Sequence, residues 1–280
     1  STLQGVPGVS RWSTDMFPQL YQTIFRANTI VEEANDENLP AGSAQDEILG
    51  QAYFMRAFAH WYLAAFWGNV PLVLNTPQTQ EDFFPMPSNQ EALFNAVVSD
   101  LTEAANRLPA TWSTSDLGRP TSGAALAFRG KTHLFLGNYS QAQQDLQAVV
   151  NSGVYDLLPA EQYEENFTTA NENNMESVFE LQFSPQDNFV WGSDAPLTGS
   201  QSNFYIDYSP PTVSLDRGHY INPHILQVFE DNGDTFRRNA TIAFDYPGAT
   251  GYGGRPFLED FAPDIEAAGV AGVNALFTRK

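Results

Sequence analysis

One stretch, Asp46 to Leu74, constrains the fold of this chain more than any other. Glycine at Gly68 suits a left-handed helix end, and Pro71 prevents the helix from restarting. We therefore expect a core helix that ends at Gly68, followed by an extended segment from Val70 to Leu74. The apolar residues of the helix recur in steps of three and four, which places them on one face over about six turns. They are Ile48, Ala52, Met55, Ala59, Tyr62, Leu63 and Phe66.

Aromatic residues spread around more than one face of the same helix. A helix that is apolar most of the way round is normally buried against several neighbours. We therefore interpret these rings as packing rather than as a ligand site, and we expect helices on both sides. They are Tyr53, Phe54, Phe58, Trp61, Tyr62, Phe66 and Trp67. The chain contains no run of about 20 apolar residues, the length that spans a membrane.

Other helices are predicted on either side of this one. Pro18 to Ala34 has helical spacing, with proline permitted in the first turn. Ser88 and Glu91 have the spacing of a capping box, which predicts a helix from there to about Leu108. Thr121 or Ser122 can cap a helix to about Leu136, and a further helix follows from about Ser140 to Asn151. Paired helices at 18–67 and 88–151 would then stack as an irregular solenoid.

The last two helices form a predicted hairpin with small residues between them. Gly130 and Ala142 would let the two helices approach closely, as in a tetratricopeptide unit. After Gly153 the pattern changes: Ser177 to Phe183 alternates as a strand, and Ser184 to Gly218 has no helical period. A short helix is expected at Pro223 to Glu230.

The predicted fold class is therefore mostly α. It consists of a tetratricopeptide-like helical-hairpin superhelix at 1–158 with an attached loop-rich region containing short strands at 159–280. We expect these two parts to belong to one domain overall.

Charge and composition exclude several function classes. The 33 acidic and 13 basic residues give a formal net charge of −20, which disfavours nucleic acids and anionic membrane surfaces as partners. Cysteine is absent, so disulfides, thiol catalysis and cysteine-ligated metals are excluded. The chain opens on STLQGVPGVSRW with neither an initiating methionine nor a signal peptide, and we expect it to be incomplete.

Enzyme motifs are missing from the sequence. No two of the four histidines have the i, i+4 spacing of a helical zinc site, and no nucleophile elbow, P-loop or dinucleotide fingerprint is present. Asp231 to Asp234 lacks the full spacing of a calcium loop. We predict no catalytic residue, no metal and no cofactor. Carboxylates are numerous enough for a glycoside hydrolase, which stays an alternative because sequence cannot show which carboxyl has a raised pKa.

Five segments, in order along the chain, resemble the SusD/RagB family of nutrient-binding lipoproteins. They are RAFAHWYLAAFWGNVPLV at 56–73, NQEALFNAVVSDLTEAANRLP at 89–109, GRPTSGAALAFRGKTHLFLGNYSQAQQDLQAVVNSGVYDL at 118–157, NMESVFELQF at 174–183 and NPHILQVFEDNGDTFRRNATI at 222–242. The resemblance implies a protein of the outer membrane and cell surface in Bacteroidetes-type bacteria. It also implies a partner, a SusC-like TonB-dependent outer-membrane transporter. We expect contact with the membrane only through a lipid anchor outside these 280 residues.

A neutral sugar presents a flat apolar face and a rim of hydroxyls, which proteins meet with exposed aromatic rings beside polar side chains. The resemblance implies ligand-binding residues in the loop that enters the first helix and in the loop region after the central strand. Those places hold Arg11, Trp12 and Asp15, and then Asn188, Trp191, Tyr205 and Tyr208.

The resulting hypothesis is a surface protein that captures a glycan or oligosaccharide and delivers it to the transporter. Three alternatives stay open at this point. The first is a peptide-binding protein of the same fold, as in the RagB branch, which would favour strand edges over ring stacking. The others are a glycoside hydrolase and a tetratricopeptide scaffold that binds only protein.

Overall fold

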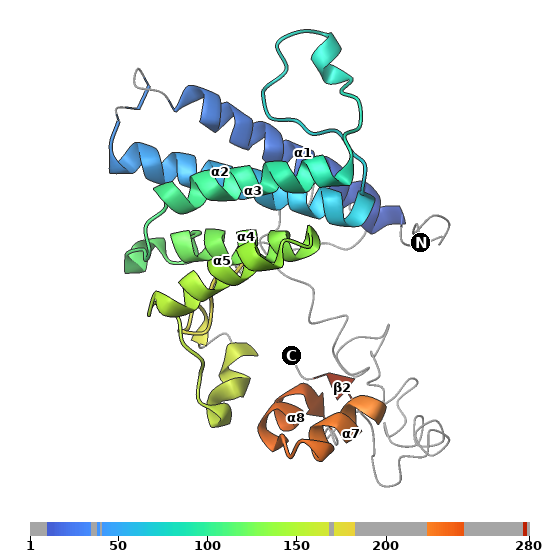
Figure 1. Cartoon of the computed structure of the whole chain (residues 1–280), viewed down its shortest axis with the longest axis vertical. Helices are drawn as coiled ribbons and strands as arrows, with labels where there is room; N and C mark the ends of the chain where they lie inside the picture. The colour runs from blue at the N-terminus through green and yellow to red at the C-terminus, as the bar shows by residue number, and fades with distance from the viewer. Residues whose placement is uncertain are drawn as a thin grey trace, which may run out of the picture. The chain divides into compact units, whose positions relative to one another are not determined.

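The structure is a computed structural model that describes residues 10–34, 38–39, 41–167, 171–182, 223–243 and 277–278. The chain divides into two compact units, Ser1–Asp156 and Leu157–Lys280. The described part of the first unit is helical (Figure 1), and the predicted mostly α class is confirmed. Its elements are α1 (Ser10–Glu33), α2 (Ser43–Trp67), η1 (Glu81–Phe83), α3 (Gln90–Arg107), η2 (Thr114–Asp116), α4 (Ser122–Phe135) and α5 (Tyr139–Asn151).

Each helix of the first unit packs against the next along the chain, so the expected stack of paired helices is confirmed. Helix α2 lies between α1 and α3 and is buried on most of its circumference. The ring of Trp61 contacts Phe94 of α3 and Phe128 and Phe135 of α4, at centroid distances of 6.3, 5.6 and 5.1 Å. Ile48 and Phe66 were expected in the core, but they lie near the two ends of α2 and are 39% and 55% exposed.

The α4–α5 hairpin has the close approach that its small residues predict. A Cβ atom at Gly130 would stand 2.9 Å from Cγ of Leu146 and 3.4 Å from the carbonyl oxygen of Ala142. The hydroxyl of Thr121 accepts a 3.0 Å hydrogen bond from the amide of Ala124 and caps α4. Helix α2 ends as predicted at Gly68, whose φ is +75°.

Two predicted helix starts are wrong. Helix α1 begins at Ser10, eight residues before Pro18, because the first helix continues past the proline to bring Phe17 onto Trp67 at 5.2 Å. The N-cap of α3 is Asn89, whose Oδ1 accepts a 2.7 Å hydrogen bond from the amide of Ala92. The capping box at Ser88 does not form, since the Ser88 amide donates to the carbonyl of Val70 at 3.0 Å.

The second unit contains short elements. They are η3 (Ala160–Phe167), α7 (Pro223–Asp231), α8 (Thr235–Thr241), β1 (Ile242–Ala243) and β2 (Phe277–Thr278). Strands β1 and β2 pair antiparallel, with Ile242 opposite Thr278. Helix α8 packs against η3 and α7.

The strand predicted at Ser177 to Phe183 is absent from residues 177–182, and Phe183 lies outside the described residues. Alternating side chains form a strand only beside a hydrogen-bonding partner. Here the side chains of Glu180 and Gln182 instead accept hydrogen bonds from the amide and side chain of Asn173, at 3.1 and 3.2 Å. In the portion of the chain that the structure describes, no helix has the length and apolar character needed to cross a membrane.

Candidate functional site

A buried ion pair lies between α2 and α3. The guanidinium of Arg56 donates to the two carboxylate oxygens of Asp100 at 2.8 and 2.7 Å, and the residues are only 6% and 4% exposed. Burial raises the pKa of Asp100, and the hydrogen bonds and charge of Arg56 oppose that rise. Burial would lower the pKa of Arg56, but Asp100 outweighs it and the pKa lies above its ordinary value. Arg56 therefore stays charged.

The remaining donor of Arg56 extends this pair to α1 and to the segment after α2. Its Nη1 donates to Oδ1 of Asn28 at 2.9 Å and to the carbonyl of Leu74 at 3.0 Å. Nearby, Nε2 of His60 accepts the amide of Val73 at 3.4 Å. Burial, and then the positive charge of Arg56, lowers the pKa of His60 to about 4, so the imidazole is neutral and can accept.

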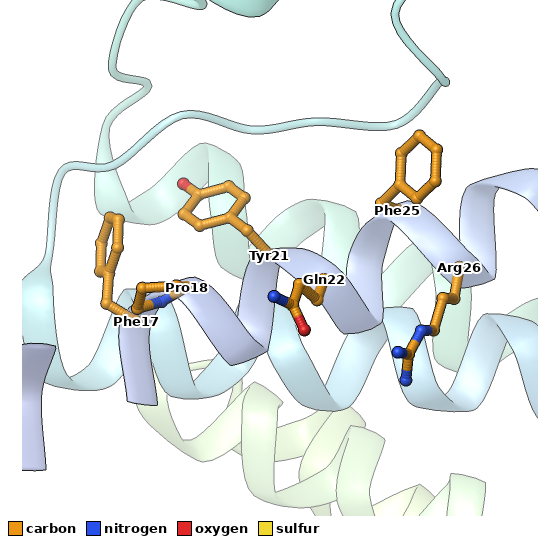
Figure 2. A pocket seen from close by; sticks show the side chains of 6 residues that line it. All are labelled: Phe17, Pro18, Tyr21, Gln22, Phe25 and Arg26. Carbon is orange, nitrogen blue, oxygen red and sulfur yellow. The ribbon is translucent and has the colours of Figure 1, made fainter. Parts of the chain in front are cut away.

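The segment Val70–Thr76 lies along α1, as Figure 2 shows, and is held there by side chains of that helix. Tyr21 donates to the carbonyl of Pro71 at 2.8 Å, and Asn28 donates to the carbonyl of Val73 at 3.3 Å. The carboxylate of Glu32 accepts the amide of Thr76 at 2.7 Å. The buried cluster and α1 together fix the path of this segment.

A shallow groove of about 650 Å³ follows the outer face of α1 beside this segment. Three aromatic rings lie four residues apart along the helix, on the side that meets Val70–Thr76, and the other lining side chains form a second row (Figure 2). Burial raises the pKa of Tyr21 to about 12, so its hydroxyl stays protonated and donates to Pro71. The residues that line the groove are Phe17, Pro18, Tyr21, Gln22, Phe25 and Arg26.

The groove combines ring faces with polar donors. Phe25 is 53% exposed, and Gln22 and Arg26 are exposed beside it. Among the described residues no carboxylate forms an ion pair with Arg26. Such a surface suits a ligand with a flat apolar face and hydrogen-bonding groups around it.

The predicted site residues are only partly within the described structure. Arg11, Trp12 and Asp15 lie in the first turns of α1, and not in a loop before the helix as the sequence suggested. Steps of four and three place positions 11 and 15 on the same side of α1 as Pro18 and Gln22. Asn188, Trp191, Tyr205 and Tyr208 lie outside the described residues.

By helical register, position 12 lies opposite Tyr21, which it precedes by nine residues or about two and a half turns. It lies on the same side of α1 as Arg26, which it precedes by about four turns. The groove residues themselves were missed from the sequence. A usable signal was present, because Phe17, Tyr21 and Phe25 repeat every four residues beside the inward-facing Leu20 and Ile24.

Comparison with known proteins agrees with this architecture. Residues 9–134 match a SusD-like family model described as starch-binding and associating with the outer membrane. A SusD-like protein of Formosa agariphila is 25% identical over 170 residues, which are 61% of this chain and 32% of that protein. Residues 9–134 are thus similar to the SusD-like family.

Solved structures of SusD-like proteins show the same fold. A SusD superfamily protein from Bacteroides vulgatus is 28% identical, with a TM-score of 0.68 over 94% of this chain and 53% of that structure. A structure described as a laminarin-binding SusD-like protein has a TM-score of 0.70 at 22% identity, over 94% of this chain and 57% of its own. The chain thus spans about a third of the curated relative and about half of these solved structures.

Proposed function

We propose that this SusD-like chain captures a glycan or oligosaccharide at the cell surface and delivers it to a partner TonB-dependent outer-membrane transporter. The observation that supports capture most directly is the groove on α1, where Tyr21 and Phe25 present rings beside Gln22 and Arg26. The family model's description associates the family with starch and the outer membrane, and one solved neighbour is described as binding laminarin. Attachment through a lipid anchor is part of the proposal.

The chemistry of the groove favours a neutral sugar as the ligand. A pyranose ring can lie flat on an exposed aromatic ring while its hydroxyls meet amide and guanidinium groups. Phe25 supplies such a ring face, and Gln22 and Arg26 supply donors within one turn of it. The open shape of the groove suits a chain that continues in both directions, such as an oligosaccharide.

Binding without catalysis is supported by the carboxylates. A glycoside hydrolase needs an acid with a raised pKa facing a second carboxylate across a cleft. Among the described residues, the carboxyl whose pKa is raised is Asp100, and it is 4% exposed and bound on both oxygens by Arg56. Substrate cannot reach it. We therefore propose no hydrolytic activity.

The proposed ligand contacts extend beyond the groove. Positions 11 and 15 lie on the groove's side of α1 by register, and Arg11, Trp12 and Asp15 stay proposed contacts on that helix. Asn188, Trp191, Tyr205 and Tyr208 complete the proposal from the region after residue 182.

Isothermal titration of the purified chain against laminarin, xyloglucan oligosaccharides and starch fragments tests the capture step. At least one glycan should bind, and Trp191→Ala and Phe25→Ala should each weaken binding about tenfold, equivalent to about 1.4 kcal/mol. Phe66→Ala is the matched control, because Phe66 is 55% exposed on α2 and outside the groove. Binding of peptides with no glycan binding would favour the peptide-binding alternative instead.

A further inference from the structure

The loop between α2 and α3, residues 75–88, displays three large apolar side chains to solvent. Phe83, Phe84 and Met86 are 66%, 77% and 83% exposed, and we refer to them as the apolar tip. Within the described residues, Phe84 and Met86 are the most exposed large apolar side chains. Figure 1 shows the loop standing clear of helices α1 to α3. Exposed apolar groups gathered in this way commonly mark an interaction site.

The loop holds the apolar tip in a fixed conformation. The carboxylate of Asp82 accepts the amides of Gln78 and Thr79 at 2.9 and 2.8 Å, and the Thr79 hydroxyl at 3.0 Å. These hydrogen bonds lower the pKa of Asp82, so the carboxylate is charged and the turn stays closed at neutral pH. The amide of Phe84 then donates to the carbonyl of Glu81 at 3.0 Å, which closes the turn η1.

The root of the loop is tied to the helices. Pro71 and Pro87 form an antiparallel bridge, and the amide of Ser88 donates to the carbonyl of Val70 at 3.0 Å. The amide of Gln90 donates to Oδ1 of Asn69 at 3.0 Å. A loop that is ordered before binding loses little conformational entropy when a partner covers it. An ordered display of apolar side chains is therefore suited to docking.

We infer that the apolar tip docks into an apolar recess bordered by basic side chains on the extracellular face of the partner transporter. The inference rests on the proposed function, which supplies that partner. Residues 75–88 include Glu81 and Asp82 and contain no lysine or arginine. This acidic border complements a basic rim.

The same charges argue against a second copy of this chain, or an anionic lipid surface, as the partner of the apolar tip. Two copies of a chain with a net charge of −20 repel each other, and the carboxylates beside the apolar tip would face one another in a symmetric contact. An anionic lipid surface is disfavoured for the same reason, because juxtamembrane contacts with it need lysine and arginine. A basic protein surface satisfies both the apolar side chains and the charges.

The loop at residues 75–88 and the groove on α1 are both connected to Pro71. Pro71 accepts the hydrogen bond of Tyr21 in the groove through its carbonyl, and the same residue bridges to Pro87 at the root of the loop. A partner that covers the apolar tip would therefore contact a loop whose root is bonded to the groove. This relationship connects capture to delivery.

Biolayer interferometry with the immobilised chain tests the inference, using as probe a detergent-purified TonB-dependent outer-membrane transporter from the same organism. The triple variant Phe83→Ser/Phe84→Ser/Met86→Ser should bind the transporter at least tenfold more weakly than the wild type. Glu81→Lys should weaken transporter binding less than the triple variant does. Raising the salt concentration should reduce the effect of Glu81→Lys, because salt screens charges. Because all four side chains are exposed, each variant should keep the wild-type circular dichroism and Tm. Tyr139→Ser is the matched control, since Tyr139 is 71% exposed on α5 and should bind like the wild type.

Each other outcome overturns the inference in a distinguishable way. Equal affinity of the triple variant and the wild type would remove the apolar tip from the interface and leave the proposed delivery intact. Sedimentation of the wild type, but not of the triple variant, with phosphatidylethanolamine–phosphatidylglycerol vesicles would assign the tip to a lipid surface. Failure of the wild type to bind the transporter would reject delivery together with the docking site. Glycan titration would still decide capture separately.

Discussion

Arg56 and Asp100 connect the middle of α2 to α3 through two hydrogen bonds of 2.8 and 2.7 Å, with both side chains buried. The third guanidinium nitrogen of Arg56 contacts Asn28 of α1 and the carbonyl of Leu74. One side chain thus joins three helices and the segment that borders the groove. Since charges are costly to bury, removing either partner affects all of these elements.

Asp100→Ala should lower the free energy of unfolding by about 3–5 kcal/mol, because Arg56 would be left as an uncompensated buried charge. Urea denaturation followed by circular dichroism measures this. The double variant Arg56→Met/Asp100→Leu removes both charges and should be less destabilised than Asp100→Ala. A loss below about 1 kcal/mol in the single variant would contradict the role assigned to the pair.

His60 should make the protein less stable in acid. Its pKa is about 4 in the folded state against 6.5 ordinarily, so the unfolded chain binds a proton between these values while the folded chain does not. Stability should therefore decrease as the pH falls from about 6.5 to 4, by about 3 kcal/mol from this residue. Denaturation series at several pH values measure it.

His60→Gln is the control for that pH dependence, because glutamine keeps an acceptor for the Val73 amide and does not titrate. Asp100 is present in both proteins, so the difference between the two curves isolates the histidine. The variant should lose less stability than the wild type over this pH range. Parallel curves would show that His60 is accessible to protons in the folded state.

Gly130→Ala should destabilise the wild-type protein but stabilise a Leu146→Ala variant. In the wild type the new Cβ meets Leu146 at 2.9 Å, and this overpacking should exceed the gain of about 1 kcal/mol from helix propensity. In a Leu146→Ala background the contact is gone, so the same substitution should stabilise by up to about 1 kcal/mol. Thermal and urea unfolding of the four proteins of this cycle give the coupling. Additive effects would mean that the Leu146 side chain or the helix backbone moves aside at no cost.

Tyr21→Phe removes the hydroxyl that holds Pro71 and leaves the ring in the groove. The free energy of unfolding should fall by about 1 kcal/mol, which is typical for one lost hydrogen bond. Glycan affinity should fall as well, because the segment beside the groove loses one of its attachments to α1. Thr23→Ala is a suitable comparison on the same helix, since its hydroxyl donates to the carbonyl of Gln19 and the residue is not part of the groove lining. Equal glycan affinities of the two variants would show that the Tyr21 hydroxyl does not contribute to ligand binding.

Local signals predicted the parts of the fold that local forces determine. Gly68 ends α2 because glycine tolerates a φ of +75°, and Gly130 marks the close α4–α5 approach because any side chain there meets Leu146. The start of α1 was wrong because a proline that often begins a helix here lies inside one, with Phe17 packed on Trp67. That contact depends on the tertiary structure, which residue spacing does not show.

The candidate site was harder to predict for a similar reason. Arg56 and Asp100 are 44 residues apart, and no local pattern pairs them. The groove is lined by α1, and the hydrogen bond that holds its Tyr21 to Pro71 of the segment after α2 joins residues 50 apart in the chain. The family resemblance directed attention to the beginning of the first helix, and ligand binding there stays a prediction. The ring series at Phe17, Tyr21 and Phe25 became visible as a candidate site only in the folded structure.

The hydrogen bonds that hold the segment Val70–Thr76 against α1 and α2 are made almost entirely to its main-chain atoms. Tyr21, Asn28 and Arg56 each bind one of its carbonyl oxygens, and His60 and Glu32 bind its amides. Main-chain groups are the same in nearly every residue, so α1 and α2 dictate the route of this segment without dictating the side chains at 71–76, which are half-exposed or exposed. Side chains such as Leu72 and Leu74 could thus be substituted while the route of the main chain beside α1 stays unchanged.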